Sequence, residues 1–237
     1  MSLNKSTIFD KRQNIQIAID GPGGSGKSTI AKKLSQQLGF TYIDTGAMYR
    51  AIALYCINNN ISSEDKQAVI ESLHNIDISI HYIKETQQVF LNNENVSDKI
   101  RTLAVGQITS VISAYEPVRA KLLNIQRNMA SLHNVVMDGR DIGTVILPTA
   151  DLKIFLTASV ETRAKRRQLE LAEKGETPSL DHVINQIKER DHRDYTRDIA
   201  PLIQATDAVL IDTTDMTIDE TVKKILILVE KLFVEKL

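Results

Sequence analysis

The sequence predicts an α/β fold, in which helices cover both faces of a five-stranded parallel sheet. Five short apolar runs recur along the chain, and segments with helical spacing separate them. The 237 residues, 42% of them hydrophobic, can bury one sizeable core and a smaller lobe. We therefore expect a single domain over residues 15–237, preceded by a tail at 1–14. The apolar runs are residues 15–20, 40–44, 135–138, 152–158 and 208–212.

The first expected strand and the first expected helix enclose a glycine-rich loop. Residues 15–20 (IQIAID) are apolar and stop at this loop, and residues 27–38 then place apolar side chains at helical spacing. Gly39 stands where a left-handed helix cap is expected, and residues 40–44 (FTYID) are typical of a second strand. The chain is therefore predicted to begin as strand, loop, helix and strand.

About 90 residues separate the second apolar run from the third, which is too long for a simple crossover. Residues 76–97 alternate apolar and polar positions, and Asn92-Asn93 suits a tight turn. A small antiparallel strand cluster is therefore predicted there. Helical spacing at residues 105–112 and 118–129 predicts helices beside it.

Composition and charge argue against several classes of protein. With 29 basic and 30 acidic residues the formal net charge is -1, so binding to nucleic acid by general charge attraction is not expected. Cys56 is the single cysteine and cannot form an internal disulfide, and the five histidines lack the paired spacing of zinc ligands. Residues 1–14 do not resemble a signal peptide, and residues 225–229 are too short to span a bilayer. These features favour a cytoplasmic protein that binds no membrane.

The glycine-rich loop fits the pattern G-x-x-x-x-G-K-[ST] between a strand and a helix. Its glycines let backbone N–H groups surround a polyphosphate, and the helix N-terminus adds the positive end of a dipole. Lys27 is expected to reach the β- and γ-phosphates of a nucleoside triphosphate, and Ser28 to bind Mg²⁺. The alternative is a glycine-rich turn that binds nothing. The predicted triphosphate-binding residues are Gly21, Pro22, Gly23, Gly24, Ser25, Gly26, Lys27, Ser28 and Thr29.

Residues 42–50 (YIDTGAMYR) close the second strand and open a helix. Thr45 is a candidate N-cap. Tyr49 and Arg50, one helical turn later, offer a ring and a guanidinium group to a nucleotide. The alternative is a capped helix in which the tyrosine packs and the arginine is merely solvated.

Residues 138–144 (DGRDIGT) follow the third apolar run, at the strand end where α/β sheets bind ligands. Arg140 suits a phosphate, and Asp141 can accept a hydrogen bond from an exocyclic amine such as cytosine N4. The alternative is a polar turn.

Residues 189–197 (ERDHRDYTR) continue a helical pattern that begins near Val183. Spacings of three, four and seven allow Arg190, Arg193, Asp194 and Arg197 to share one face. The alternative is an exposed ladder of ion pairs on the helix surface.

These three segments resemble the D-[ST]-G-x-x-Y-R, D-G-R-D-x-G-T and E-R-D-x-R-D motifs of bacterial-type cytidylate kinases, which are P-loop nucleoside monophosphate kinases. The resemblance runs from Ile15 to about Asp212 and includes the strand cluster at 76–97. It implies the three-layer P-loop fold with a core at 15–60 and 133–237. It also implies an acceptor-binding lobe at about 61–132 with the antiparallel insertion, a lid at about 167–185, and a monomer.

The resemblance also assigns roles to individual residues. It implies catalytic roles for Lys27, Arg140 and the lid arginines Arg163 and Arg167, beside which Arg166 is a further lid arginine. It implies cytosine contacts from Ser110, Arg119 and Asp141, and a ribose contact from Asp194. Acceptor-phosphate contacts are implied for Arg50, Arg140, Arg190 and Arg197, and Thr45 and Tyr49 complete the implied CMP site.

The implied reaction transfers the γ-phosphoryl group of ATP to CMP or dCMP, with Mg²⁺ as cofactor. Such a transfer needs alignment and charge neutralisation, and closing of a lid around residues 175–178 is expected to exclude water. One rival is a kinase for another small acceptor, such as UMP, AMP or shikimate, and the D-G-R-D segment and the strand cluster count against it. The other rival is a nucleotide-binding regulator without enzymatic activity, which has no need of a second arginine-lined site.

Overall fold

The computed structural model describes residues 14–84, 86–173 and 175–235, so the predicted tail lies outside the described residues apart from Asn14. Its centre is a five-stranded sheet in the order β2-β6-β1-β7-β8, in which all neighbouring strands are parallel. The predicted parallel sheet is confirmed, and each strand lies within its predicted run or extends one residue beyond it. The strands are β1 (Gln16–Asp20), β2 (Thr41–Asp44), β6 (Val135–Gly139), β7 (Leu152–Thr157) and β8 (Val209–Asp212).

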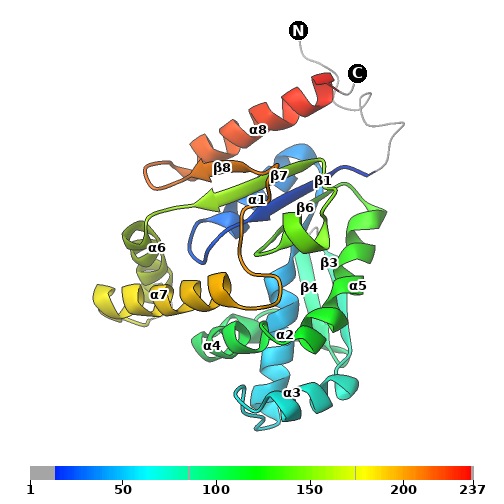
Figure 1. The fold of residues 1–237 in the computed structure, drawn as a ribbon, viewed down its shortest axis with the longest axis vertical. Helices are drawn as coiled ribbons and strands as arrows, with labels where there is room; N and C mark the ends of the chain where they lie inside the picture. The colour runs from blue at the N-terminus through cyan, green and yellow to red at the C-terminus, as the bar shows by residue number, and fades with distance from the viewer. Residues whose placement is uncertain (1–13, 85, 174, 236–237) are drawn as a thin grey trace.

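Helices cover both faces of this sheet (Figure 1). On one face, α1 (Lys27–Leu38) and α8 (Ile218–Glu235) pack against Ile17 and Ile19 of β1. On the other face, α2 (Thr45–Asn58) and α5 (Glu116–Leu132) belong to the core that includes Ala18. Successive β1 side chains therefore enter different cores, as expected for a strand buried on both sides.

Within the described residues, four further helices are present: α3 (Lys66–Ser72), α4 (Leu103–Ile112), α6 (Val160–Ala172) and α7 (Leu180–Thr196). Short turns accompany them: 3₁₀ turns η1 (Leu73–Asn75) and η2 (Lys99–Arg101), and a π turn η3 (Ile142–Ile146). The helices α6 and α7 share a small apolar cluster of their own, with Ala164, Leu171, Val183 and Ile187 buried in it. The predicted lid spans the junction of these two helices.

No helix within the described ranges is long and apolar enough to cross a membrane.

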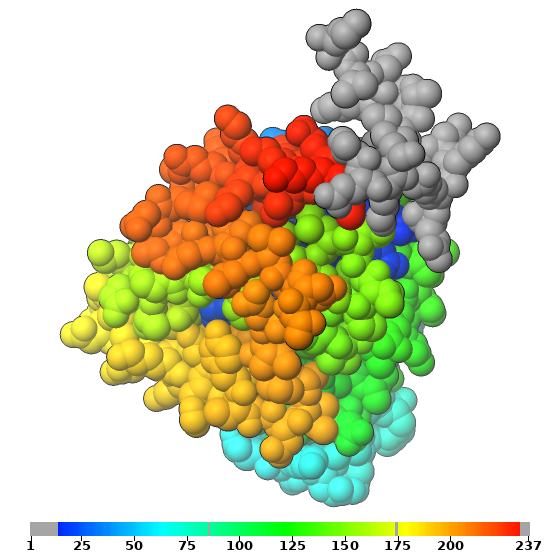
Figure 2. Space-filling model, turned by 45° about the horizontal axis from the view of Figure 1, so that its top comes forward, coloured from blue at the N-terminus to red at the C-terminus, as the bar shows by residue number. Residues whose placement is uncertain are grey.

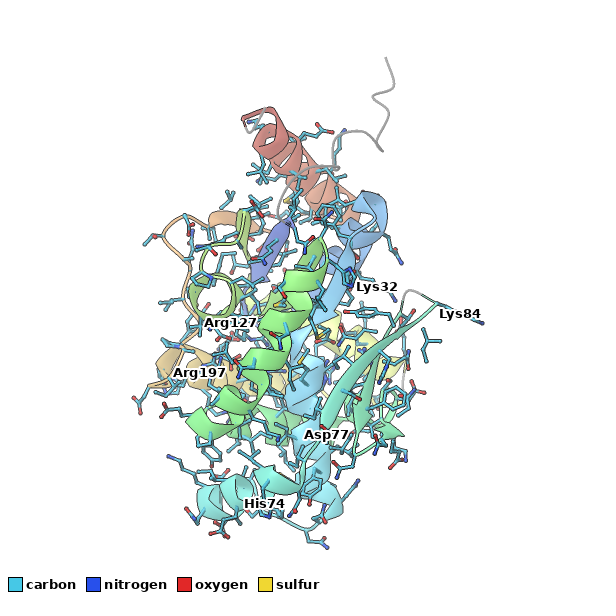
Figure 3. All side chains as sticks on the ribbon, turned by 90° about the vertical axis from the view of Figure 1, so that its right-hand side faces the viewer. Lys32, His74, Asp77, Lys84, Arg127 and Arg197 are labelled. Atoms are coloured by element: carbon cyan, nitrogen blue, oxygen red, sulfur yellow. The ribbon has the colours of Figure 1, made fainter. Side chains whose placement is uncertain are left out.

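The predicted strand cluster is a separate three-stranded antiparallel sheet, formed by β3 (Ile78–Ile83), β4 (Thr86–Leu91) and β5 (Glu94–Asn95). Asn92 and Asn93 make the tight turn between β4 and β5 with φ values of 48° and 66°. Asparagine tolerates this left-handed backbone better than most residues, which is why the pair predicted the turn correctly. Lys84 lies at the outer end of the β3–β4 hairpin (Figure 3).

Side chains of the small sheet bind the backbone of β2, at the edge of the main sheet. Gln87 accepts a hydrogen bond from Asp44 N (2.8 Å) and donates one to Asp44 O (3.1 Å). The Tyr82 hydroxyl donates to Tyr42 O at 3.0 Å. These contacts satisfy backbone groups that an edge strand leaves unpaired, and they attach the insertion directly to the residues that precede α2.

Candidate functional site

The glycine-rich loop folds over the N-terminus of α1, and its glycines are required by space and by backbone angle. A Cβ on Gly21, where φ is +146°, would lie 1.9 Å from Leu156 O. Gly26 is the left-handed N-cap of α1 with φ of 89°. The loop can therefore approach a ligand with bare backbone, as the sequence predicted.

Lys27 lies inside this loop and is only 5% exposed. Its Nζ donates to Pro22 O at 2.6 Å and to Ser25 Oγ at 3.3 Å. Burial, and then the nearby Arg140 guanidinium, hold the pKa of Lys27 well below its ordinary value. A polyphosphate beside the loop would oppose both effects and favour the charged ammonium.

Ser28, at the start of α1, meets a carboxylate at the end of β6. Its hydroxyl donates to Asp138 Oδ2 at 2.8 Å, and the Tyr42 hydroxyl donates to Asp138 Oδ1 at 2.9 Å. Burial, and next the negative charge of Asp44, raise the pKa of Asp138 to about 6. A hydroxyl beside a carboxylate supplies the hard oxygen donors that Mg²⁺ prefers, so these two residues fit that ion.

Asp138 was not among the predicted site residues, although a signal was present. It ends an apolar run that comes after the phosphate loop in the chain, and a strand end of an α/β sheet is where ligands bind. The sequence did not indicate that β6 pairs directly with β1, which is what brings Asp138 to Ser28.

Arginines from three separate elements meet the loop at Gly23. A Cβ built there would lie 3.6 Å from Arg140 Nη2 and 3.8 Å from Arg190 Nε. Arg163 of α6 donates to Gly23 O at 3.1 Å and pairs with Asp191 at 2.7 Å. The loop expected to bind the triphosphate and two arginines expected to bind the acceptor phosphate, Arg140 and Arg190, therefore meet at Gly23.

Three other residues lie differently. Arg166 donates to Thr213 O at 2.7 Å, and the Thr213 hydroxyl in turn bonds Ser25 O at 3.2 Å. Arg167 pairs with Glu170 at 3.0 Å on α6 and, among the described residues, makes no hydrogen bond to the loop. Thr29 is exposed in the first turn of α1.

Several buried polar atoms around the loop lack a hydrogen-bond partner within the described residues: Arg50 Nε, Arg190 Nε, Asp191 Oδ1 and Arg197 Nη2. Burial, and then the positive charge of Arg140, lower the pKa of Arg190 to about 10. A buried cation whose donors are unsatisfied is costly, and an anionic ligand with several oxygens would remove that cost. The arrangement is therefore typical of a phosphate-binding site.

Two buried carboxylates balance part of this positive charge. Asp194 accepts from Arg140 Nε at 2.9 Å. Although burial opposes it, Arg140 and Arg190 together hold the pKa of Asp194 below its ordinary value. Asp141 forms ion pairs with Arg119 and, at 3.9 Å, with Arg197.

A pocket of about 180 Å³ opens beside Asp141. Arg119, Asp141 and Tyr49 line it, and the Arg119 guanidinium lies 5.5 Å from the centre of the Tyr49 ring. Its wall also includes Ala200 from the segment between α7 and β8, which crosses the surface between α7 and α5 in orange (Figure 2). Ser110 is absent from this lining, and its hydroxyl accepts from Arg193 Nε at 3.1 Å instead.

Comparison with known proteins shows which family this chain belongs to. The family model described as cytidylate kinase matches residues 17–231. The chain belongs to the cytidylate kinase family.

Its relatives in this family cover most of the chain. A cytidylate kinase from Caldicellulosiruptor saccharolyticus is 50% identical over 214 residues, which is 90% of this chain and 95% of the relative. One from Caldanaerobacter subterraneus subsp. tengcongensis is 51% identical, with 89% and 92% covered. Among solved structures, a gluconokinase from Sinorhizobium meliloti has a TM-score of 0.47 at 15% identity, with 95% of this chain and 99% of that chain covered. The gluconokinase likeness is too low to add to the assignment.

One prediction about this member of the cytidylate kinase family was wrong, and it concerns the start of α2. Thr45 is not the N-cap: Asp44 holds that position, and its Oδ1 accepts from Ala47 N at 3.0 Å. Asp44 keeps an extended backbone and the helix begins at Thr45, one residue earlier than a Thr45 cap would place it. The Thr45 hydroxyl instead donates to Asp138 O at 2.8 Å. Asp44 also pairs with Arg50 at 2.7 Å, a contact that sequence reasoning missed.

Proposed function

We propose that the protein transfers the γ-phosphoryl group of ATP to CMP and dCMP, giving CDP or dCDP and ADP. The meeting of two sets of cationic groups at the phosphate loop is the observation that supports this most directly. Lys27 belongs to the loop and feels the positive charges of Arg140 and Arg190, which come from the segments that resemble the acceptor site. Two phosphorylated ligands bound on the two sides of this point would face each other for direct transfer.

On the donor side, the loop residues from Gly21 to Thr29 would bind the phosphates of ATP. The hydroxyl of Ser28 and the adjacent carboxylate of Asp138 would hold Mg²⁺. When bound, this ion neutralises charge on the β- and γ-phosphate oxygens.

On the acceptor side, we assign the phosphate of CMP to Arg50, Arg140, Arg190 and Arg197. The unpaired buried donors of Arg50, Arg190 and Arg197 support this assignment. Asp194 would contact the ribose. Asp141 and Arg119 would read the base. We assign Ser110 to the base as well, which requires its hydroxyl to exchange Arg193 for the ligand. Tyr49 and Thr45 would complete the site.

In the reaction, a phosphate oxygen of CMP attacks the γ-phosphorus, the bond to the β–γ bridging oxygen breaks, and ADP leaves with that electron pair. No general base is needed, because the nucleotide phosphate is already ionised at neutral pH. Lys27, Arg140 and Arg163 would stabilise the charge on the three transferred oxygens. Closing of the lid at about 167–185 would exclude water and bring Arg167 towards the site.

We further propose that the protein acts as a monomer in the cytoplasm. The formal net charge of -1 and the buried thiol of Cys56 are consistent with that setting. A kinase for UMP, AMP or shikimate, or a nucleotide-binding regulator, is the alternative, and the match of the cytidylate kinase model to residues 17–231 counts against both.

The decisive experiment supplies ATP and Mg²⁺ together with CMP, dCMP, UMP, AMP or shikimate, each in turn, and measures the phosphorylated product. CDP and dCDP are expected, with little ATP hydrolysis in the absence of acceptor. Asp141→Ala is expected to lower the ratio of kcat/KM for CMP to that for UMP by about tenfold to a hundredfold, because uracil offers no amine to Asp141. A preference for AMP or shikimate, or hydrolysis without an acceptor, would contradict the proposal.

A further inference from the structure

The π turn η3 follows Asp141 directly, and charged side chains from outside hold it at both ends. At its start, Asp20 Oδ1 accepts from Ile142 N at 2.8 Å and Asp20 Oδ2 accepts from Gly143 N at 2.7 Å. At its end, Arg127 of α5 donates through Nε to Ile146 O at 3.1 Å and through Nη2 to Val145 O at 2.8 Å. Figure 3 shows Arg127 on α5 beside this turn.

The negative charge of Asp20 and the positive charge of Arg127 lie at the ends of η3 where each is favourable. The first N–H groups and the last C=O groups of a helical turn have no partners inside the turn, and an anion at the start and a cation at the end complement its dipole. The turn makes its own backbone bonds, from Val145 N and Ile146 N to Asp141 O at 2.9 and 3.2 Å and from Leu147 N to Ile142 O at 2.7 Å. Asp20 and Arg127 add side-chain bonds to the backbone groups at its two ends.

The contact with Asp20 is also close and buried. Asp20 is 5% exposed, and a Cβ built on Gly143 would lie 3.4 Å from Asp20 Oδ2 and 3.1 Å from Lys153 Cδ. The turn therefore lies against Asp20 with little free space. Burying a carboxylate costs free energy, and here the two backbone hydrogen bonds to η3 offset part of that cost. The turn is therefore held in one position relative to Asp20.

Asp20 stands at the junction of the two halves of the site. It is the last residue of β1 and directly precedes Gly21 of the phosphate loop, while its carboxylate holds the backbone that follows Asp141. Asp20 thus connects the phosphate loop to Asp141, the residue that we assign to recognition of the cytosine base.

We propose that Asp20 and Arg127 are positioning residues that hold η3 and thereby place the Asp141 carboxylate for recognition of cytosine. This inference rests on the proposed function, because it assumes that Asp141 reads the base. Neither side chain is assigned a contact with a nucleotide, so both act through the backbone of η3.

The test compares Asp20→Asn and Arg127→Met with Asp151→Asn as a matched control. Asp151 makes the same kind of contact at the other end of β1, where its Oδ2 accepts from Gln16 N at 2.9 Å. An amide at position 20 can accept only one of the two backbone hydrogen bonds and turns a donor towards the other N–H. Steady-state kinetics would give KM for CMP, KM for ATP and the ratio of kcat/KM for CMP and UMP.

Asp20→Asn is expected to raise KM for CMP about tenfold and to lower the CMP-to-UMP ratio, with KM for ATP changed less than about twofold. Arg127→Met is expected to change the same quantities in the same direction by about threefold. Asp151→Asn is expected to leave all of them unchanged. Because Arg127 is exposed, its variant decides the question if Asp20→Asn does not fold.

An equal rise in KM for ATP and CMP would overturn the inference, since Asp20 would then act on the phosphate loop. A fall in kcat alone, with an unchanged CMP-to-UMP ratio, would overturn it as well. Asp141→Ala, measured in parallel, separates this inference from the proposed function. If Asp141→Ala changes the ratio while Asp20→Asn and Arg127→Met behave like the control, only the positioning role fails. If Asp141→Ala leaves the ratio unchanged, the assignment of base recognition fails first.

Discussion

Individual side chains in this site lie in surroundings that disfavour their charged forms. Lys27 and Arg190 both have lowered pKa values, caused first by burial and next by the charge of Arg140. Burial also raises the pKa of Asp20 to about 6, against the two backbone hydrogen bonds that it accepts. Nearby carboxylates offset part of the repulsion between these cations, and an arriving anionic ligand would offset more of it, which favours binding.

At the residue scale, we predict that Lys27→Met lowers kcat by about a hundredfold or more, because under the proposed function the transferred phosphoryl group would lose the cation of the phosphate loop. The far-ultraviolet circular dichroism spectrum is expected to stay unchanged. Lys33→Met is the matched control, since Lys33 lies on the same helix and pairs with Asp219 at the surface. Turnover near the wild-type rate in Lys27→Met would show that the loop does not bind the transferred phosphate.

At the scale of elements, the small antiparallel sheet is a support for the acceptor segment. Gln87 holds both backbone groups of Asp44, and Asp44 caps α2 and pairs with Arg50. The position of an arginine assigned to the acceptor phosphate thus depends on a strand from the insertion.

We therefore predict that Gln87→Ala lowers the free energy of unfolding by about 1 to 3 kcal/mol, because the buried backbone groups of Asp44 lose their partners. KM for CMP is expected to rise with it. Gln88→Ala, which alters the next side chain of β4, is the control and should change stability by less than about 0.5 kcal/mol. Urea denaturation and steady-state kinetics would measure both effects, and equal behaviour of the two variants would contradict the prediction.

The elements also divide into those that the sequence could predict and those that it could not. The strands, the phosphate loop and the Asn92-Asn93 turn follow from local patterns, since apolar runs, glycines and asparagines act through their own backbones. The π turn η3 and the contact of Asp138 with Ser28 depend on partners far away in the chain. The Asp44 cap closes on the nearby Ala47, but the backbone of Asp44 is held by Gln87, 43 positions later. No local pattern specifies which strand lies beside β1, so these contacts could not be predicted from spacing.

For the whole molecule, the unpaired buried donors predict strong stabilisation by the acceptor. At a CMP concentration of about 100 times Kd, binding to the folded state alone adds about 2.7 kcal/mol to the free energy of unfolding. For a chain of this length, Tm is then expected to rise by roughly 5 to 10 °C.

Differential scanning fluorimetry with CMP would measure this rise in Tm, with cytidine as the control that keeps the base and lacks the phosphate. Cytidine is expected to give a much smaller shift, because it brings no phosphate oxygens to the unsatisfied donor atoms of Arg50, Arg190 and Arg197. Equal shifts with the two ligands would argue against the assignment of these arginines to the phosphate.

The central place of β1 in the sheet also constrains how the chain folds during synthesis. Ile15 N bonds Asn134 Oδ1, which lies 119 positions later, and both neighbours of β1 belong to the second half of the chain. When β1 and α1 leave the ribosome they can pack on each other, but both edges of β1 stay unpaired until β6 and β7 have been made. Long-range pairing of this kind slows folding and leaves strand edges open to other chains. We expect nascent chains that end before residue 135 to be aggregation-prone and to bind chaperones.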